Sequence, residues 1–189
     1  MSFLFMKTSL EGLILIEPDC HFDERGYFIK EFEKGEFLKN GIDIEIYETF
    51  ESMSHKGTLR GLHFQSKFPQ GKLIRVTRGS AFDVAVDLRV NSPTLGRWAG
   101  FDLDERNNCI LYIPEGFAHG FLALEDETVI TYKCTDRYSK PHDSGILWND
   151  EDLAIKWPLH LIEGELTISE RDLLHPSFRT YLKTLSLPK

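Results

Sequence analysis

The sequence has few cysteines, no long apolar run and no excess of basic residues. Its three cysteines, Cys20, Cys109 and Cys134, are far apart and form no CxxC pair, which argues against a disulfide framework and a thiolate metal site. A net charge of −8 has the wrong sign for a surface that binds a nucleic-acid backbone. No run could span a bilayer, and the short apolar start lacks the features of a signal peptide. We therefore expect a cytoplasmic protein with no nucleic-acid or membrane partner.

The length and the composition favour one folded unit. A chain of 189 residues can bury a large core without cross-links. Its hydrophobic residues make up 41% and its charged residues 28%, which is typical of globular proteins. We expect a single domain over residues 1–189.

Short β-branched and aromatic segments separated by Gly, Pro, Asn and Asp dominate the chain. This pattern predicts antiparallel strands in a sandwich or barrel. The predicted strands are residues 12–17, 42–50, 58–65, 72–78, 81–89, 98–103, 109–113, 120–124 and 128–135.

Residues 81–90 alternate between large apolar side chains and small or polar ones. Such a period of two predicts a strand with one packed face and one polar face. We expect Asp87 to lie on a solvated outer face. Asp83 has two possible places, because acidic residues can also line the cavity of a barrel.

Helices are predicted to be minor. We expect a short helix at residues 34–40, a turn at residues 150–153 and a helical region that begins at Ser169 and is interrupted by Pro176. Ser169 is a good helix N-cap, and Glu170 and Asp172 would place negative charge in the first turn.

One strand carries both a cation and an imidazole. In RGLHFQ, at residues 60–65, regular alternation would send Arg60 and His63 to opposite faces. Gly61 between them offers a way out, since a glycine inside a strand often marks a bulge. Both side chains would then address one cavity.

The segment PEGFAHG at residues 114–120 resembles the second half of a cupin metal motif, P-x-G-x-x-H. A metal-binding cupin would also need an H-x-H pair, where this chain has His63, Phe64 and Gln65. Two imidazoles without a carboxylate make a poor site, because metal sites normally take three or four protein ligands. We therefore expect no metal.

Eight blocks in order resemble the dTDP-4-dehydrorhamnose 3,5-epimerase family over nearly the whole chain. They are DERG (23–26), RGLHFQ (60–65), PQGKL (69–73), FDVAVD (82–87), PEGFAHGF (114–121), YKCTD (132–136), ILWND (146–150) and SERD (169–172). The resemblance implies an all-β fold, a cupin-type antiparallel β-barrel (jelly roll) with a few short peripheral helices. It also implies an isomerase without a cofactor.

The implied reaction inverts C3, C5 or both in a nucleoside-diphosphate-4-keto-6-deoxy sugar. The most direct case is dTDP-4-dehydro-6-deoxy-D-glucose going to dTDP-4-dehydro-L-rhamnose through an enolate. By resemblance, His63 is the base, Asp172 orients it, and Tyr132 returns a proton from the opposite face. Lys72 matches a lysine beside the C4 oxygen, where a cation favours the enolate.

The same resemblance implies the binding residues. Arg60 and His119 match positions that address the diphosphate. Phe22 and Arg25 match residues donated by the neighbouring subunit of a homodimer. Tyr138, Asp143 and Arg171 fall where the family also contacts substrate, although Glu and Lys are commoner at the last two.

Four positions depart from the family pattern. This chain has Lys30 where the family usually has Glu, Glu48 where it has Gln, Phe50 where it has Asn, and Arg137 where it commonly has an aromatic residue. They suggest an alternative, a mono-epimerase or an enzyme for a GDP- or CDP-linked 4-keto sugar. A metal-dependent cupin enzyme and a non-catalytic sugar-binding barrel are further alternatives. The complete catalytic set argues against the last.

Overall fold

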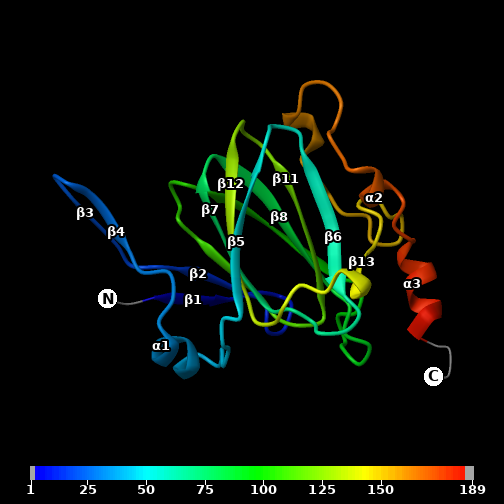
Figure 1. The fold of residues 1–189 in the computed structure, drawn as a ribbon, viewed down its shortest axis with the longest axis horizontal. Helices are drawn as coiled ribbons and strands as arrows, with labels where there is room; N and C mark the ends of the chain where they lie inside the picture. Colours follow the sequence, from blue (N-terminus) through cyan, green and yellow to red (C-terminus); the bar gives the residue numbers. More distant parts are fainter. Residues whose placement is uncertain (1–2, 186–189) are drawn as a thin grey trace.

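Two antiparallel sheets face each other in the computed structural model, which describes residues 3–185 (Figure 1). The first sheet has the order β1 (Leu4–Lys7), β2 (Ile14–Glu17), β10 (Ile110–Ile113), β7 (Lys72–Arg78), β12 (Thr128–Cys134), β5 (Glu48–Ser54). The second has the order β13 (Asp143–Gly145), β6 (Leu59–Gln65), β11 (Phe117–Ala123), β8 (Ser80–Asp87), β9 (Trp98–Asp104). The all-β prediction is confirmed.

The helices are few and peripheral, as expected. They are α1 (Lys34–Lys39), α2 (Glu170–Leu173) and α3 (Phe178–Leu185), with short 3₁₀ turns at Lys140–His142 and Leu159–Leu161. Ser169 caps α2, since its Oγ accepts a hydrogen bond from the Asp172 N–H at 3.1 Å, and Pro176 lies between α2 and α3. Within residues 3–185, no helix is both long enough and apolar enough to cross a membrane.

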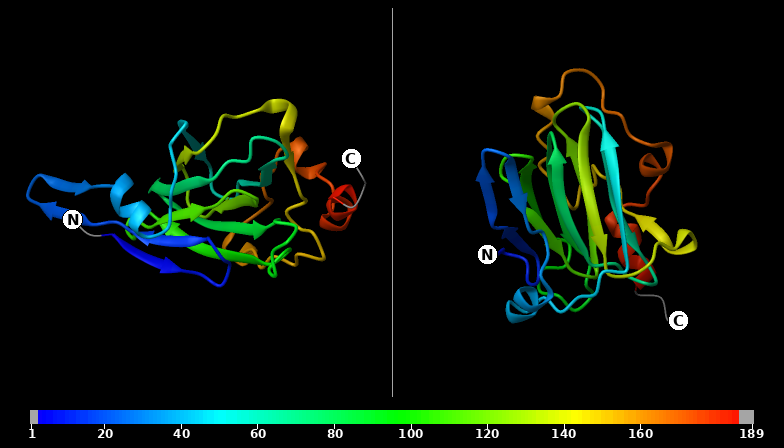
Figure 2. Two further views of the ribbon diagram at one scale, coloured as in Figure 1. Left: turned by 90° about the horizontal axis from the view of Figure 1, so that it is seen from below. Right: turned by 60° about the vertical axis from the view of Figure 1, so that its left-hand side comes forward.

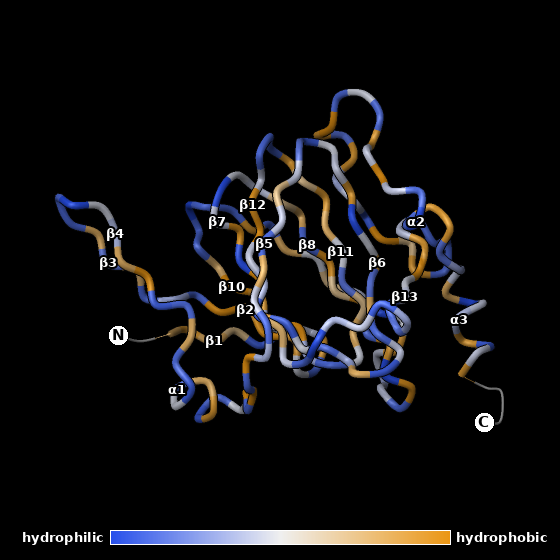
Figure 3. Tube along the Cα trace, in the orientation of Figure 1, coloured by the Kyte–Doolittle hydropathy of each residue, from blue (hydrophilic) through white to orange (hydrophobic). Residues whose placement is uncertain are grey.

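The main core lies between the two sheets. Ile74, Val76 and Ile130 point inward from the first sheet and meet Ala85 and Phe121 of the second. Figure 3 shows hydrophilic residues concentrated in the connecting loops around these strands. The inward-facing positions of β6, β7, β11 and β12 therefore decide what lines the barrel interior.

The outer faces of both sheets are also covered in part. α1 and the aromatic residues near it pack on the first sheet around the fully buried Phe37. The C-terminal segments, with Trp157 and Phe178, pack on the second sheet against Val84 and Val86. Strand β8 is consequently buried on both faces.

This burial corrects the prediction of a solvated face on β8. Asp87 is fully buried and accepts hydrogen bonds from Arg89, Ser92 and Thr94. Asp83 is also fully buried and faces the barrel interior. The alternation of the strand was read correctly, but the face that carries Asp83 and Asp87 turns toward the barrel interior, and the C-terminal segments cover the other face around Val84 and Val86.

Some strands differ from their predicted bounds. β5 begins at Glu48, whereas residues 42–47 form no strand and instead place Ile42 and Ile44 against α1. Four short strands were not predicted: β1, β13 and the pair β3 (Cys20–Asp23) and β4 (Gly26–Ile29). All four are at most 4 residues long, too short to give a clear period.

The β3–β4 hairpin projects away from the barrel on the side opposite α3 (Figures 1 and 2). Its strands carry hydrophobic residues and its tip is hydrophilic (Figure 3). Phe22 is 71% exposed and Tyr27 60% exposed, although their rings contact each other at a centroid distance of 5.9 Å. A pair of exposed aromatic residues on a projecting hairpin is typical of a segment that packs on another chain.

Candidate active site

A pocket of about 240 Å³ opens in the barrel between the edge strand β5 and strand β6. Its walls come from both sheets. It is lined by Phe50, Ser52, Arg60, His63, Lys72, His119, Phe121 and Tyr132. Six of these eight residues are among the fourteen predicted site residues, so the structure brings the predicted base, acid and lysine together in one pocket.

A bulge in β6 explains how Arg60 and His63 share this pocket. His63 pairs with His119 and Arg60 pairs with Phe121, so residues 61–62 stand opposite Gly120 alone. The extra residue reverses the alternation. Gly61 has φ +128°, and a Cβ on it would lie 2.5 Å from the Gly120 Cα. Glycine is therefore required here, and the predicted role of Gly61 is confirmed.

His63 and Asp172 form a hydrogen-bonded pair at one wall. His63 Nε2 lies 2.8 Å from Asp172 Oδ1, and the Gly61 N–H donates to Oδ2 at 3.1 Å. Burial alone would raise the pKa of Asp172, but these hydrogen bonds and the neighbouring imidazole hold it well below its usual range. A carboxylate accepts only, so it keeps the proton of His63 on Nε2 and leaves Nδ1 as the basic nitrogen.

Arg171 lies beside the His63–Asp172 pair. Its guanidinium nitrogens are 2.9 Å from His63 Nε2 and 3.3 Å from Asp172 Oδ1. Because Nε2 donates to the carboxylate, the first of these contacts is a close approach of two donors. Arg171 also binds the Asp143 carboxylate, which accepts a hydrogen bond from the Tyr138 hydroxyl at 3.0 Å. The three predicted substrate contacts thus form one chain beside the base.

Tyr132 lies on the opposite sheet, in β12. It is 6% exposed, and burial raises the pKa of its phenol well above the usual value, while Ser52 and Arg60 act in the other direction. The ring of Phe50 stacks on that of Tyr132 with centroids 4.7 Å apart and planes inclined by 15°. The phenol therefore holds its proton at neutral pH and is fixed in orientation.

Lys72 and His119 line the interior of the pocket. Burial lowers the pKa of Lys72, against the nearby Cys134, Asp143 and Asp83, and within residues 3–185 its ammonium group makes no hydrogen bond or ion pair. His119 Nε2 lies 3.0 and 2.9 Å from the two Asp83 oxygens. Burial also lowers the pKa of His119. An ammonium without an anionic partner is free to act on a ligand.

Arg60 is held at the mouth of the pocket by β5. Its Nε donates to the Ser54 Oγ at 3.1 Å, and a terminal nitrogen donates to the Met53 carbonyl at 3.3 Å. The remaining donors of the guanidinium are available to an anion. This anchoring to a strand fixes where a diphosphate would be received.

The other predicted residues do not line this pocket within one chain. Phe22 and Arg25 lie on the projecting hairpin, where Arg25 pairs with Asp23, and Lys30 follows β4. Glu48 accepts a hydrogen bond from Gln70 at 2.9 Å, and Arg137 lies over the Phe68 ring. Only Phe50, among the four departures from the family pattern, faces the catalytic groups.

The sequence did not reveal Ser52 and His175. Ser52 shares the inward face of β5 with Phe50, a relation that was concealed because the predicted strand ended at residue 50, whereas β5 continues to Ser54. His175 lies three residues after Asp172, and its Nε2 is 3.5 Å from Asp172 Oδ1 while its ring meets that of His63 edge-on at 5.7 Å. Helical spacing from Asp172 is the signal that could have found it.

His63, Asp172 and His175 are close enough to be tested as metal ligands, since their ligand atoms all lie within 4.8 Å of one another. The sequence argument against a metal had not included this set. However, the Arg171 guanidinium already contacts both His63 and Asp172, so a divalent cation there would lie against a fixed positive charge. These residues fit a proton-transfer pair better than a metal centre.

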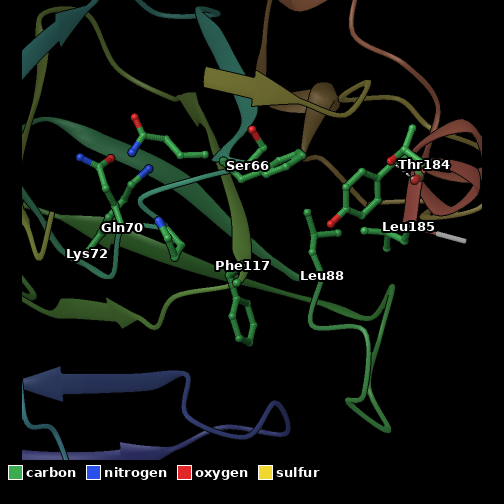
Figure 4. Close-up of a pocket in the computed structure, with 12 residues that line it drawn as sticks. Ser66, Gln70, Lys72, Leu88, Phe117, Thr184 and Leu185 are labelled. Atoms are coloured by element: carbon green, nitrogen blue, oxygen red, sulfur yellow. Dashed lines mark hydrogen bonds between the residues drawn. The ribbon is translucent and has the colours of Figure 1, made fainter. Parts of the chain in front are cut away.

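A second cavity, of about 220 Å³, lies between the end of the barrel and α3 (Figure 4). Lys72 and Gln70 line one end, and Thr184 and Leu185 of α3 line the other. Phe117 and Leu88 supply apolar surface between them. Lys72 thus borders both cavities and separates the catalytic pocket from this one.

The amino-acid sequence of the chain is similar to those of known proteins. Residues 7–180 match the family model described as dTDP-4-dehydrorhamnose 3,5-epimerase. The protein of that name from Methanothermobacter thermautotrophicus is 55% identical over 170 residues, covering 90% of this chain and 91% of that protein.

Solved structures give the same result. The dTDP-6-deoxy-D-glucose-3,5-epimerase from Legionella pneumophila, in complex with dTDP-4-keto-L-rhamnose, is similar with a TM-score of 0.92 and 38% identity, covering 100% of this chain and 98% of that one. A 3′-monoepimerase from Streptomyces bikiniensis in complex with dTDP-quinovose has a TM-score of 0.88 at 33% identity, covering 97% and 92%.

Proposed function

The chain belongs to the dTDP-4-dehydrorhamnose 3,5-epimerase family, with its cupin-type β fold, and from that premise we propose that it converts dTDP-4-dehydro-6-deoxy-D-glucose to dTDP-4-dehydro-L-rhamnose. Membership makes it an isomerase that epimerises a sugar nucleotide. The observation that carries the substrate proposal is the single pocket with a histidine base on one sheet and a buried phenol on the other.

The base in this proposal is His63. The C4 ketone acidifies the protons at C3 and C5, and Nδ1 of His63 removes one of them while Asp172 stabilises the imidazolium. A charge-assisted hydrogen bond of this kind contributes about 1.5–3 kcal/mol. The 2.8 Å contact between Nε2 and the Asp172 carboxylate supports the role.

Lys72 stabilises the enolate. Proton removal moves negative charge onto the C4 oxygen, and a cation aimed at that oxygen favours the enolate over the ketone. Because Lys72 has no anionic partner within residues 3–185, its charge is not already neutralised. Arg60 and His119 would hold the diphosphate and the far side of the sugar.

Tyr132 returns the proton from the opposite face. His63 and Lys72 lie on facing sheets, and Tyr132 lies on β12, the neighbour of the strand β7 that carries Lys72. Removal on one side and delivery on the other inverts the carbon. No step needs a metal or an organic cofactor, and we propose that the protein uses neither.

We also propose a homodimer in which the β3–β4 hairpin of each subunit completes the pocket of the other. The projecting hairpin, with the exposed Phe22 and the exposed Arg25 at its tip, supports this arrangement. Phe22 would cover the nucleotide base, and Arg25 would exchange Asp23 for the diphosphate. Closed two-fold dimers are the commonest oligomers. We propose a cytoplasmic location for this enzyme.

A second candidate is a mono-epimerase or an enzyme for a GDP- or CDP-linked sugar. Phe50 favours it, because an aromatic ring stacked on Tyr132 occupies space where the family usually has Asn. Similarity to a 3′-monoepimerase is compatible with either outcome.

Proton NMR of the purified protein with candidate substrates in heavy water tests both proposals. dTDP-, GDP- and CDP-linked 4-keto-6-deoxy sugars are compared, and deuterium is scored at C3 and C5 separately. Rapid labelling of both carbons with the dTDP-glucose derivative alone supports the first proposal. Labelling of one carbon, or faster turnover of another nucleotide, supports the second.

The roles are tested with two variants in the same assay. His63→Ala should abolish hydrogen exchange. Tyr132→Phe should keep exchange at the carbon that faces His63 and lose the inversion. Near-normal exchange in His63→Ala would show that the base has been assigned to the wrong residue.

A further inference from the structure

One buried hydroxyl in the pocket has no assigned role. Ser52 lies on β5 opposite Ile130 of β12, and its Oγ is buried without a properly formed hydrogen bond to any residue of the described part, 3–185. Buried polar groups are nearly always hydrogen-bonded, so such an exception calls for an explanation. The neighbouring Ser54 differs, because its Oγ accepts a hydrogen bond from Arg60.

Among the catalytic groups, Ser52 acts on the Tyr132 phenol. Both residues line the same pocket, and Ser52 counteracts the rise in the pKa of Tyr132 that burial causes. Phe50, two residues before Ser52, fixes the plane of the Tyr132 ring. The Tyr132 ring is therefore held in one orientation, and Ser52 acts on its phenol from the next inward position of the adjacent strand β5.

Proton delivery turns the Tyr132 phenol into a phenolate, in surroundings that disfavour negative charge. When Tyr132 gives its proton to the enolate, the C=C electron pair forms the new C–H bond and the C4 ketone returns. The O–H bond of Tyr132 breaks and leaves a phenolate. Burial and the nearby Asp83 carboxylate both disfavour that charge, whereas Arg60 favours it. Arg60 is partly engaged by Ser54 and Met53.

We propose that Ser52 is a positioning residue for Tyr132, whose hydroxyl donates a hydrogen bond to the phenolate formed when the proton is delivered. The inference rests on the proposed role of Tyr132 as the proton donor. A serine hydroxyl both donates and accepts, so it can face a phenol before the transfer and a phenolate after it. The hydrogen bond becomes strong only with the charge, and the interaction therefore acts on the delivery step.

The experiment measures the ratio of completed inversion to deuterium exchange at the carbon facing His63. Exchange reports proton removal by His63, whereas inversion also requires delivery by Tyr132. Ser52→Ala should keep exchange within about 3-fold and lower the ratio about 10-fold or more, as expected for a lost hydrogen bond to a charged group. Ser52→Thr, which keeps the hydroxyl, should restore the ratio.

Thr49→Ala is the matched control on the same strand. It removes an exposed hydroxyl on the outer face of β5 and should change neither the exchange rate nor the ratio. An unchanged ratio in Ser52→Ala, an equal loss of exchange and inversion, or a loss that Ser52→Thr does not restore would each overturn the proposal. If Tyr132→Phe itself inverts substrate normally, the proposed role of Tyr132 fails instead, and the two failures are thereby distinguished.

Discussion

Replacing Asp172 by Asn should disable the base through its tautomer. The Gly61 N–H points at Oδ2 and can be satisfied only by an oxygen, so the amide oxygen of an asparagine must take that side. The amide nitrogen then faces His63 Nε2, which lies 2.8 Å from the present Oδ1. Nε2 must accept, the imidazole proton moves to Nδ1, and the basic lone pair is lost from the position that faces substrate.

The expected loss of turnover is large because Asp172 is buried, so no water molecule can take over the role of its carboxylate. Asp172 is 2% exposed, and the equivalent exchange behind a catalytic histidine lowers turnover by about 10⁴-fold. This corresponds to about 5 kcal/mol in the barrier. The free energy of unfolding should change much less, since both hydrogen bonds keep a partner.

The rate of deuterium incorporation in heavy water measures the loss directly. Glu170→Gln is the control, because Glu170 is exposed on the same helix α2 and contacts neither His63 nor Gly61. Substrate affinity should stay near normal in Asp172→Asn. Exchange within 10-fold of the wild-type rate would refute the tautomer argument, and a loss shared by Glu170→Gln would show damage to the helix instead.

Three further predictions concern the metal, the dimer and acid stability. Exhaustive chelation should leave turnover unchanged, and a loss that one divalent ion restores would contradict the metal-free proposal. Light scattering should show a dimer, and a fully active monomer would exclude the proposed dimer. Mixing inactive Arg25→Ala and His63→Ala subunits should recover about one intact pocket per heterodimer. Burial would raise the pKa of Asp87, but hydrogen bonds from Arg89, Ser92 and Thr94 hold it well below the usual range. Asp87 therefore stabilises the fold above about pH 4, and this contribution is lost as the pH falls further. Acid unfolding of Asp87→Asn, followed by circular dichroism, should therefore depend less on pH below about 4 than that of the wild type.

The sequence predicted the strands that have a clear period and flanking turn residues. It also predicted the bulge at Gly61, because only a glycine there lets Arg60 and His63 point the same way. It could not predict the environment of Asp87, since a period of two shows that the faces of a strand differ and says nothing about what covers them. Asp87 shares the interior face of β8 with Ala85 and is enclosed there by Arg89, Ser92 and Thr94, whereas Trp157 and Phe178 cover the opposite face around Val84 and Val86.

The site was predicted less completely than the fold. Motif blocks identified groups that move protons or bind phosphate, because such groups need particular chemical types at particular places. Ser52 escaped, since a lone serine in a strand is unremarkable until the register shows that it shares a face with Phe50. Lys30 and Glu48 were selected by comparison of residue types alone, which carries no information on whether a side chain reaches the pocket.

Placing the base and the acid on separate sheets has a consequence for how this enzyme can diverge. His63 moves with the five-stranded sheet and Tyr132 with the six-stranded one, and the apolar side chains between them set the gap that a sugar ring must bridge. A change in volume at Ile74 or Phe121 would alter that gap without touching any group that transfers a proton. The number of carbons inverted can therefore drift through packing in the interior, while the catalytic residues themselves stay the same.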